Sequence, residues 1–301
     1  MSPKEEKAFA FSLTPKFAWP SIGLVFALIV AQNSLAFAAF YGWVSYWIAA
    51  PLLGVIAFWW YTPVHESIHK NFGRGRFAEA MHLVAGWWGS TTLFNTFPIM
   101  RKTHLLHHSH VNGPDDPDKM LVGGSFTRLV GVTFLAATLY IIPYFIVERI
   151  PGADYGNARK NLSKREYRMH WIAVHLMQSM IPICIYFGYG WDLFALFLAP
   201  SFIGAFLLAV FLQWAPHAPF EGTGRYNNSR ASDWKAGDFL LLGQNLHLVH
   251  HLWPSVPFYN YRPLFEGLRA HLIEKEARIE GFWIEAEAPI ASEPESARAV
   301  S

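Results

Sequence analysis

Four long stretches of the chain are almost free of charged residues, and they fall into two pairs. The first pair covers residues 17–40 and 43–64 and is joined by the uncharged turn around Gly42. The second pair covers residues 171–189 and 191–214, with a tight turn at Gly188-Tyr189-Gly190 between them. At about 1.5 Å of rise per residue, each stretch is long enough for a hydrocarbon core of roughly 30 Å. The pattern therefore predicts an all-α membrane protein with four transmembrane helices in two hairpins.

Composition supports this fold class and excludes several others. Of the 301 residues, 52% are hydrophobic and only 15% charged, and the net charge of +2 without a basic run gives no reason to expect nucleic acid. The single cysteine, Cys184, excludes an intramolecular disulfide and a site built from several thiolates. Residues 1–16 contain no apolar run, so a cleaved signal peptide is not expected. We expect one membrane domain over residues 17–282 and a disordered tail over 283–301, which is rich in Ala, Glu, Ser and Pro.

Histidine is the residue type that carries candidate chemistry. Eight of the 14 histidines fall into three groups at helical spacing: His65 and His69; His104, His107 and His108; His247, His250 and His251. Spacings of three and four residues place side chains on one face of a helix. One metal ion rarely takes more than four protein ligands, so eight imidazoles predict a dinuclear metal centre. Four isolated histidines are expected to be structural: His82, His170, His175 and His271. His110 follows His108 by two residues, points off the ligand face and is left out of the site.

The first group also fits the H-E-x-x-H pattern of zinc proteases, in which the glutamate is the general base. His65-Glu66-Ser67-Ile68-His69 has this form. A protease needs about three protein ligands on one zinc, which would leave most of the clustered histidines unexplained. We therefore interpret Glu66 as a hydrogen-bond partner that orients an imidazole, and keep a membrane metalloprotease as the less favoured alternative.

Topology follows from the need to bring the histidine groups together. Residues 129–147 are uncharged, but a crossing there would put the second and third groups on opposite faces of the membrane, so an in-plane helix is predicted. Residues 77–100 are broken by polar residues and glycines and are predicted to be re-entrant or interfacial, and residues 254–282 to carry a surface helix. Lys and Arg concentrate between the hairpins and are missing from the hairpin turns. By the positive-inside rule, both ends of the chain and the histidines face the cytoplasm. A helical cap on that side is predicted to hold the histidine site.

Taken together, the three histidine groups resemble the membrane fatty acid desaturase and hydroxylase superfamily, whose three histidine boxes hold two irons that activate dioxygen. Within it, the flanking residues look like those of the cyanobacterial-type β-carotene hydroxylases. The similar segments are residues 112–118, 216–220 and 243–261, inside a resemblance that covers roughly 60–265. One departure is Glu66, where that subfamily would have aspartate.

Further site residues are expected beside the clustered histidines, the first from the resemblance and the others from their positions in the sequence. His217 is expected as a ninth iron ligand, the alternative being an interfacial histidine. Asn245, two residues before His247, is expected to hold a metal-bound water. The turn containing Asp115, Asp116 and Asp118 is expected either to support the ligands, with Asp115 and Asp118 as candidates, or to form an ordering salt bridge with Arg101 or Lys102.

The implied reaction is hydroxylation at carbon 3 of a β-ionone ring, which converts β-carotene into β-cryptoxanthin and zeaxanthin. It needs two irons, dioxygen and two external electrons. Neither G-x-G-x-x-G nor a cysteine cluster is present, so a ferredoxin or similar donor is expected. The expected location is a bacterial inner membrane with the site on the cytoplasmic side, and the expected substrate is lipophilic. An acyl-lipid desaturase or hydroxylase is the main alternative, and a metal carrier is a third.

Overall fold

The structure is a computed structural model that describes residues 1–141 and 161–281. Three of its helices are long and apolar enough to cross a membrane: α2 (Trp19–Phe40), α3 (Tyr46–Ile68) and the continuous helix Gly190–Trp214. The last consists of α11 (Gly190–Leu193), α12 (Ala199–Leu208) and two π-helical segments, Phe194–Leu198 and Ala209–Trp214. These helices lie where three of the four predicted spans were placed. The fourth predicted span falls in α10 (Lys164–Tyr186), which is not among the helices that meet these criteria of length and apolarity.

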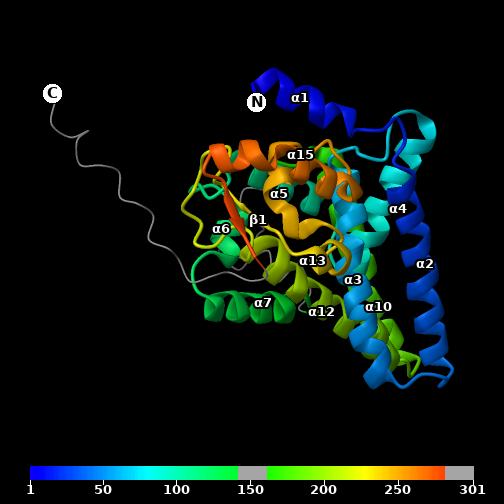
Figure 1. Ribbon diagram of the computed structural model, residues 1–301. Coiled ribbons are helices and arrows are strands. Elements are labelled where there is room, and N and C mark those ends of the chain that lie inside the picture. Colours follow the sequence, from blue (N-terminus) through cyan, green and yellow to red (C-terminus); the bar gives the residue numbers. More distant parts are fainter. Residues whose placement is uncertain (142–160, 282–301) are drawn as a thin grey trace.

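The apolar helices pack closely because small residues line their contact. A Cβ atom added to Gly204 of α12 would lie 2.7 Å from Ala57 Cβ and 3.0 Å from the Phe58 backbone nitrogen of α3. Only glycine allows this approach, as is common where membrane helices meet. The second hairpin is thereby held against α3, the helix that ends in the first histidine group (Figure 1).

Two segments next to the predicted spans form helices. Helix α3 continues beyond the predicted span, which stops at residue 64, to Ile68, so His65 lies in the last turn of the helix. The segment predicted as re-entrant or interfacial forms α4 (Arg76–Thr92) and the start of α5 (Phe97–His110). Helix α4 packs along α3, and Gly89 fits against Val64. The polar residues that break the hydrophobic pattern here lie in buried helix contacts.

A cap of shorter elements covers one end of the apolar helices. It contains α6 (Pro117–Val122), α13 (Lys235–Leu240), α14 (His247–Leu252), α15 (Tyr261–Glu274) and two 3₁₀ turns, Gln244–Leu246 and Phe258–Asn260. Its core is apolar and includes Leu246, Leu248, Leu264, Phe265 and Leu268. Two short strands, β1 (Arg230–Ser232) and β2 (Arg278–Glu280), pair in parallel, so the expectation of an all-α fold needs this small correction.

Helix α7 (Phe126–Ile141) covers the described part of the predicted in-plane helix. It runs across the direction of α2 and α3 rather than along them (Figure 1). Trp214 at the end of the last apolar helix donates from Nε1 to the Gly124 carbonyl, 3.1 Å away, just before α7. The remaining residues of this predicted helix and the predicted tail, 283–301, lie outside the described residues.

Candidate metal centre

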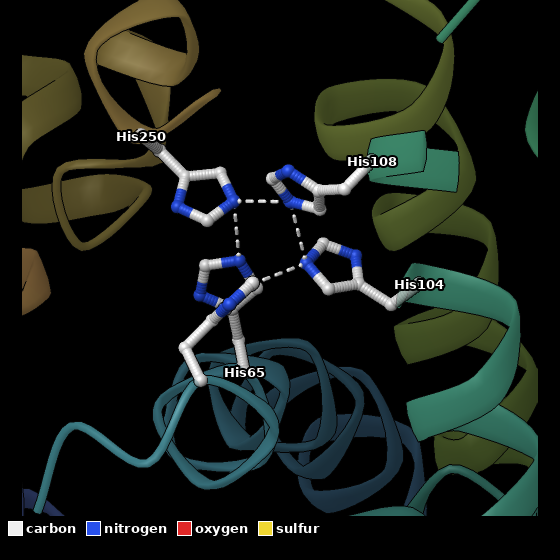
Figure 2. A group of neighbouring side chains, drawn as sticks. His65, His104, His108 and His250 are labelled. Carbon is white, nitrogen blue, oxygen red and sulfur yellow. Dashed lines mark hydrogen bonds between the residues drawn. The ribbon is translucent and has the colours of Figure 1, made fainter. Parts of the chain in front are cut away.

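Five imidazoles from three helices converge at the end of α3. We call this set cluster A; each member offers one nitrogen, all within 4.8 Å of one another, and the members are His65, His69, His104, His108 and His250. Along the cluster, the Nε2–Nε2 distances are 2.9 Å for His65–His250, 2.8 Å for His250–His108 and 3.0 Å for His108–His104. His69 Nε2 lies 2.9 Å from His104 Nε2. Figure 2 shows rings from these separate helices turned toward one shared space.

These distances fit a shared metal ion better than a set of hydrogen bonds. A neutral imidazole has one N–H, which can point at one acceptor only. Yet His108 Nε2 and His250 Nε2 each have two imidazole nitrogens within 3.0 Å. Two nitrogens bound about 2.1 Å from one ion, at right angles, are about 3 Å apart. The donor set of cluster A therefore has the spacing that a single ion requires.

A second set of four imidazoles lies beside the first. Cluster B consists of His107, His217, His247 and His251, again with one nitrogen each within 4.8 Å. His251 Nε2 lies 3.0 Å from His247 Nε2 and 3.3 Å from His107 Nε2. The His217 ring is 4.6 Å from that of His107, and its Nε2 is buried without a hydrogen-bond partner among the described residues. The rings of His108 and His251 stack at 4.4 Å, so the two clusters are neighbours.

Burial keeps these imidazoles in the neutral form that binds metals. It lowers the pKa of His69 to about 4, and burial together with neighbouring imidazoles lowers that of His108 to about 2. The same causes put the pKa of five other ligand candidates well below the ordinary value: His104, His217, His247, His250 and His251. The site thus favours a bound cation over protonated imidazoles.

Hydrogen-bond partners on the far side of the rings set their orientation. Tyr61 Oη lies 3.2 Å from His104 Nδ1, and Tyr261 Oη lies 3.1 Å from His250 Nδ1. Such partners fix the tautomer and direction of metal-binding imidazoles. Neither tyrosine was predicted as a site residue from its spacing to the histidines. Tyr61 precedes His65 by one helical turn, which is a usable signal, but nothing in the sequence links Tyr261 to His250 rather than to the helix that it begins.

His107 differs from the others because it faces a carboxylate. Its Nδ1 lies 2.9 Å from Asp116 Oδ1 and 3.7 Å from Asp118 Oδ2, with all three side chains nearly or fully buried. Burial opposes the charged imidazole, but the two carboxylates outweigh it and raise the pKa of His107. The predicted role of Asp115 is corrected here, because its side chain is exposed and the carboxylate at the site belongs to Asp116. Asp118, the other candidate, accepts a hydrogen bond from Gln213 Nε2 at 3.1 Å.

Two further predicted roles do not match the positions of the side chains. The Glu66 carboxylate accepts hydrogen bonds from Ser21 Oγ (2.7 Å), Asn71 Nδ2 (3.2 Å) and the Phe258 backbone N–H (3.3 Å), so it ties helices together instead of orienting an imidazole. Asn245 Nδ2 donates to the Ser232 and Trp234 carbonyls at 2.9 and 3.1 Å. Its amide therefore holds the loop before α13, and neither residue belongs to cluster A or cluster B.

The histidines expected to be structural lie outside both clusters. His110 is exposed, and its Nδ1 lies 3.0 Å from the Leu106 carbonyl of its own helix. His170 Nδ1 lies 2.7 Å from Thr96 Oγ1, which joins α10 to the start of α5. The structure thus brings together the nine histidines singled out from the sequence and leaves the others apart.

Fold and site together define a helical protein with apolar membrane helices and a buried centre made of histidine. A sequence model of the fatty acid desaturase family matches residues 41–283. The chain belongs to this family, as the resemblance predicted; the closer kinship with β-carotene hydroxylases stays a prediction.

Two curated desaturases are similar to the chain. Dihydrorhizobitoxine desaturase from Bradyrhizobium elkanii is 24% identical over 249 residues, which cover 72% of this chain and 66% of that protein. The fatty acid desaturase of Bacillus subtilis (strain 168) is 23% identical over 221 residues, 65% of this chain and 60% of that protein. The chain therefore spans less than two thirds of the length of each of these relatives.

Proposed function

We propose that the protein is a membrane oxidoreductase of the fatty acid desaturase type, with two irons held by clusters A and B. The observation that carries the proposal is the convergence of nine imidazole nitrogens, from six buried and three partly buried histidines, in two adjacent sets. Imidazole ligands suit iron, and more ligands are present than one ion takes. When bound, the irons supply the reaction of dioxygen with a C–H bond, and the electrons come from a separate donor such as a ferredoxin.

The chain's own residues position the ions and exclude water from them. His65 and His69 extend from the end of α3, and α5 and α14 each give histidines to both clusters. Burial removes bulk water from the ligands, which strengthens their interaction with a cation. Tyr61, Tyr261 and Asp116 hold the rings that they contact in one orientation.

The proposed substrate is a carotenoid with a β-ionone ring, hydroxylated at carbon 3. Support for this choice is the resemblance of residues 112–118, 216–220 and 243–261 to β-carotene hydroxylases. Within the last segment, Tyr261 contacts a clustered histidine and Asn260 Nδ2 donates to the Leu13 carbonyl at 2.7 Å. These contacts are within the protein and would be needed for packing with any substrate. The choice of a carotenoid therefore depends on the resemblance alone.

Oxidation of acyl lipids is the second candidate, favoured by the family and by the name of the similar fatty acid desaturase of Bacillus subtilis. One scaffold of this kind supports several C–H oxidations. Two other classes fit less well. In a zinc protease of H-E-x-x-H type, Glu66 would stand beside the bound zinc, whereas its carboxylate is held by Ser21, Asn71 and Phe258. A metal carrier would place ligands within the membrane helices, whereas the clustered histidines lie at the end of α3, on α5 and α14, and just after the last apolar helix.

Expression in cells that accumulate β-carotene and supply a reduced ferredoxin tests the substrate. We expect β-cryptoxanthin and then zeaxanthin in the chromatogram of extracted pigments. The matched control carries His250→Ala, which removes one nitrogen of cluster A. Unchanged pigment together with newly unsaturated or hydroxylated acyl chains would transfer the assignment to acyl lipids.

We also propose four spans, with both clusters on the cytoplasmic face of a bacterial inner membrane. Helix α10 has 23 residues, a length of about 34 Å at about 1.5 Å per residue. Its first turns carry Lys164, Arg165 and Arg168, which lower its overall hydropathy but suit a cytoplasmic end. The crosswise direction of α7 supports an in-plane position (Figure 1).

Reporter fusions at four positions test this topology. We expect cytoplasmic signals for fusions at Gly113 and Gly222, and periplasmic signals for fusions at Gly42 and Gly188, in the two hairpin turns. A periplasmic signal at Gly113 or Gly222 would contradict the four-span arrangement.

A further inference from the structure

The first residues of the chain form a helix that packs on the cap. Helix α1 (Pro3–Ser12) is capped at its start by Ser2 and Glu5 and lies over α15 (Figure 1). Ala10 belongs to the cap core, and Phe9 fits so closely that a Cβ atom on Gly267 of α15 would be 2.2 Å from the phenyl ring. Because α1 packs in this way, the side chain of Glu6 points into the interior of the cap.

Glu6 is a carboxylate with only 1% of its surface exposed. It accepts hydrogen bonds from Trp253 Nε1 at 2.8 Å, Tyr226 Oη at 2.8 Å and Arg225 Nη2 at 3.1 Å. His271 Nε2 lies 3.9 Å away. One buried side chain of α1 therefore joins two segments of the cap that are far apart in the sequence, the loop at Arg225 and Tyr226 and the end of α14.

Both of these segments lead directly to cluster B. Trp253 follows His251 by two residues. Tyr226 precedes Asn228 by two residues, and the Asn228 carbonyl oxygen lies 3.0 Å from His217 Nδ1. A path also leads toward His69, because the Pro254 carbonyl, next to Trp253, accepts from Asn71 Nδ2 at 2.9 Å. Asn71 is, however, anchored independently by Glu66, which accepts from its Nδ2 at 3.2 Å and from its backbone N–H at 2.8 Å.

The same loop also reaches His107, by way of Asn112. Asn112 Nδ2 donates to the Asn228 carbonyl at 2.8 Å, and the Asn112 backbone N–H donates to Asp116 Oδ2 at 2.7 Å. Asp116 in turn contacts His107. Three of the four cluster B histidines are thus connected to Glu6 through short chain segments and hydrogen bonds.

We propose that Glu6 is a positioning residue for the metal site of cluster B, holding His217, His251 and His107 at the spacing that an ion needs. The inference rests on the proposed function, in which the clusters hold iron. Glu6 does not touch the metal; it acts through Trp253 and the 225–228 loop. Loss of its carboxylate leaves the Trp253 N–H, the Tyr226 hydroxyl and Arg225 without their shared acceptor, and the two segments separate.

Iron analysis of the purified full chain, loaded with ferrous iron in detergent, tests this role. The unchanged protein is expected to hold about two irons per chain with the spectroscopic signature of a coupled pair. In Glu6→Ala, iron falls to about one per chain and the coupled signal is replaced by that of an isolated ion, because cluster A keeps its ligands. Glu6→Gln restores most of the coupled signal, because its amide oxygen still accepts from Trp253.

Two further variants separate positioning from general stability. Glu5→Ala changes the exposed neighbour, which only caps α1, and is expected to leave two irons bound. Trp253→Phe keeps an aromatic ring but removes the N–H, and is expected to shift the iron content in the same direction as Glu6→Ala. A coupled pair that persists in both Glu6→Ala and Trp253→Phe overturns the inference and leaves the proposed function standing. An equal loss of both irons in these variants also overturns it. Failure of the unchanged chain to bind a pair overturns the proposed function itself.

Discussion

Replacement of His108 by alanine is expected to abolish substrate oxidation, with activity falling more than about 100-fold. His108 Nε2 lies 3.0 Å from His104 Nε2 and 2.8 Å from His250 Nε2, in the middle of cluster A. Its ring also stacks on that of His251 in cluster B. The change removes a central nitrogen ligand and opens a cavity between the clusters. Product formed per chain and iron bound per chain should therefore fall together.

His110→Ala is the matched control, since it changes the same residue type on the same helix, two positions away. The His110 side chain is exposed and contacts only a carbonyl of its own helix among the described hydrogen bonds. We expect full activity and unchanged iron content. A His108→Ala protein that keeps both irons and full activity would show that His108 is not one of the ligands that the site needs.

The sequence predicted the apolar helices well because their signal is local. Uncharged runs of about 20 residues need no partner to be recognised. The predicted second span stops at residue 64, whereas α3 continues through the polar residues Glu66 and Ser67 to Ile68. Both are buried, and their polar atoms are satisfied by residues distant in sequence: Ser21 donates to Glu66, and Ser67 Oγ donates to the His82 carbonyl at 2.6 Å. A hydrophobic pattern cannot reveal such partners.

The same limit explains the missed strands. β1 and β2 lie far apart in the chain and have only three residues each, too few for a recognisable alternation. Their pairing is reinforced by the buried Arg230, whose Nη1 donates to Glu280 Oε2 at 2.6 Å. The contact depends on how the cap folds as a whole, so the local sequence carries no sign of it.

At the site, spacing identified the ligand candidates but not their division between two clusters. His104 and His108 are one helical turn apart and both join cluster A, while His107, between them, joins cluster B. The third group divides likewise, with His250 in one cluster and His247 and His251 in the other. A helix turns by about 100° per residue, so neighbouring positions diverge toward separate ions. Which ion each meets depends on the facing helices, which only the fold supplies.

The fold is also needed to choose among the three aspartates after the second histidine group. Asp115, Asp116 and Asp118 carry the same side chain and lie in one turn, so composition and spacing do not distinguish them. Pro117 begins α6, and Asp116, the residue before the helix, accepts from the Asp118 N–H at 2.9 Å. That capping position directs its carboxylate back toward α5 and His107. Asp115 is exposed to solvent instead.

Asp116→Asn is therefore expected to weaken iron binding at cluster B by about 10- to 100-fold. The carboxylate accepts from the Asn112 N–H on one oxygen, while its other oxygen faces His107 Nδ1. Asparagine has one acceptor oxygen, so an NH₂ group must face one of these donors. The resulting unpaired buried group costs about 1–3 kcal/mol of stability, and the negative charge that makes the His107 imidazole a stronger ligand is lost.

Competition with a chelator of known affinity measures the change, and Asp115→Asn is the matched control. The control removes the same charge from the neighbouring residue, which is exposed, and should leave the competition curve and the melting temperature unaltered. Equal weakening in the two variants would mean that the charge of the turn matters and not the contact with His107. Asp116 contacts His107 and also connects to Glu6 through Asn112 and Asn228. The iron of cluster B should therefore be released before that of cluster A.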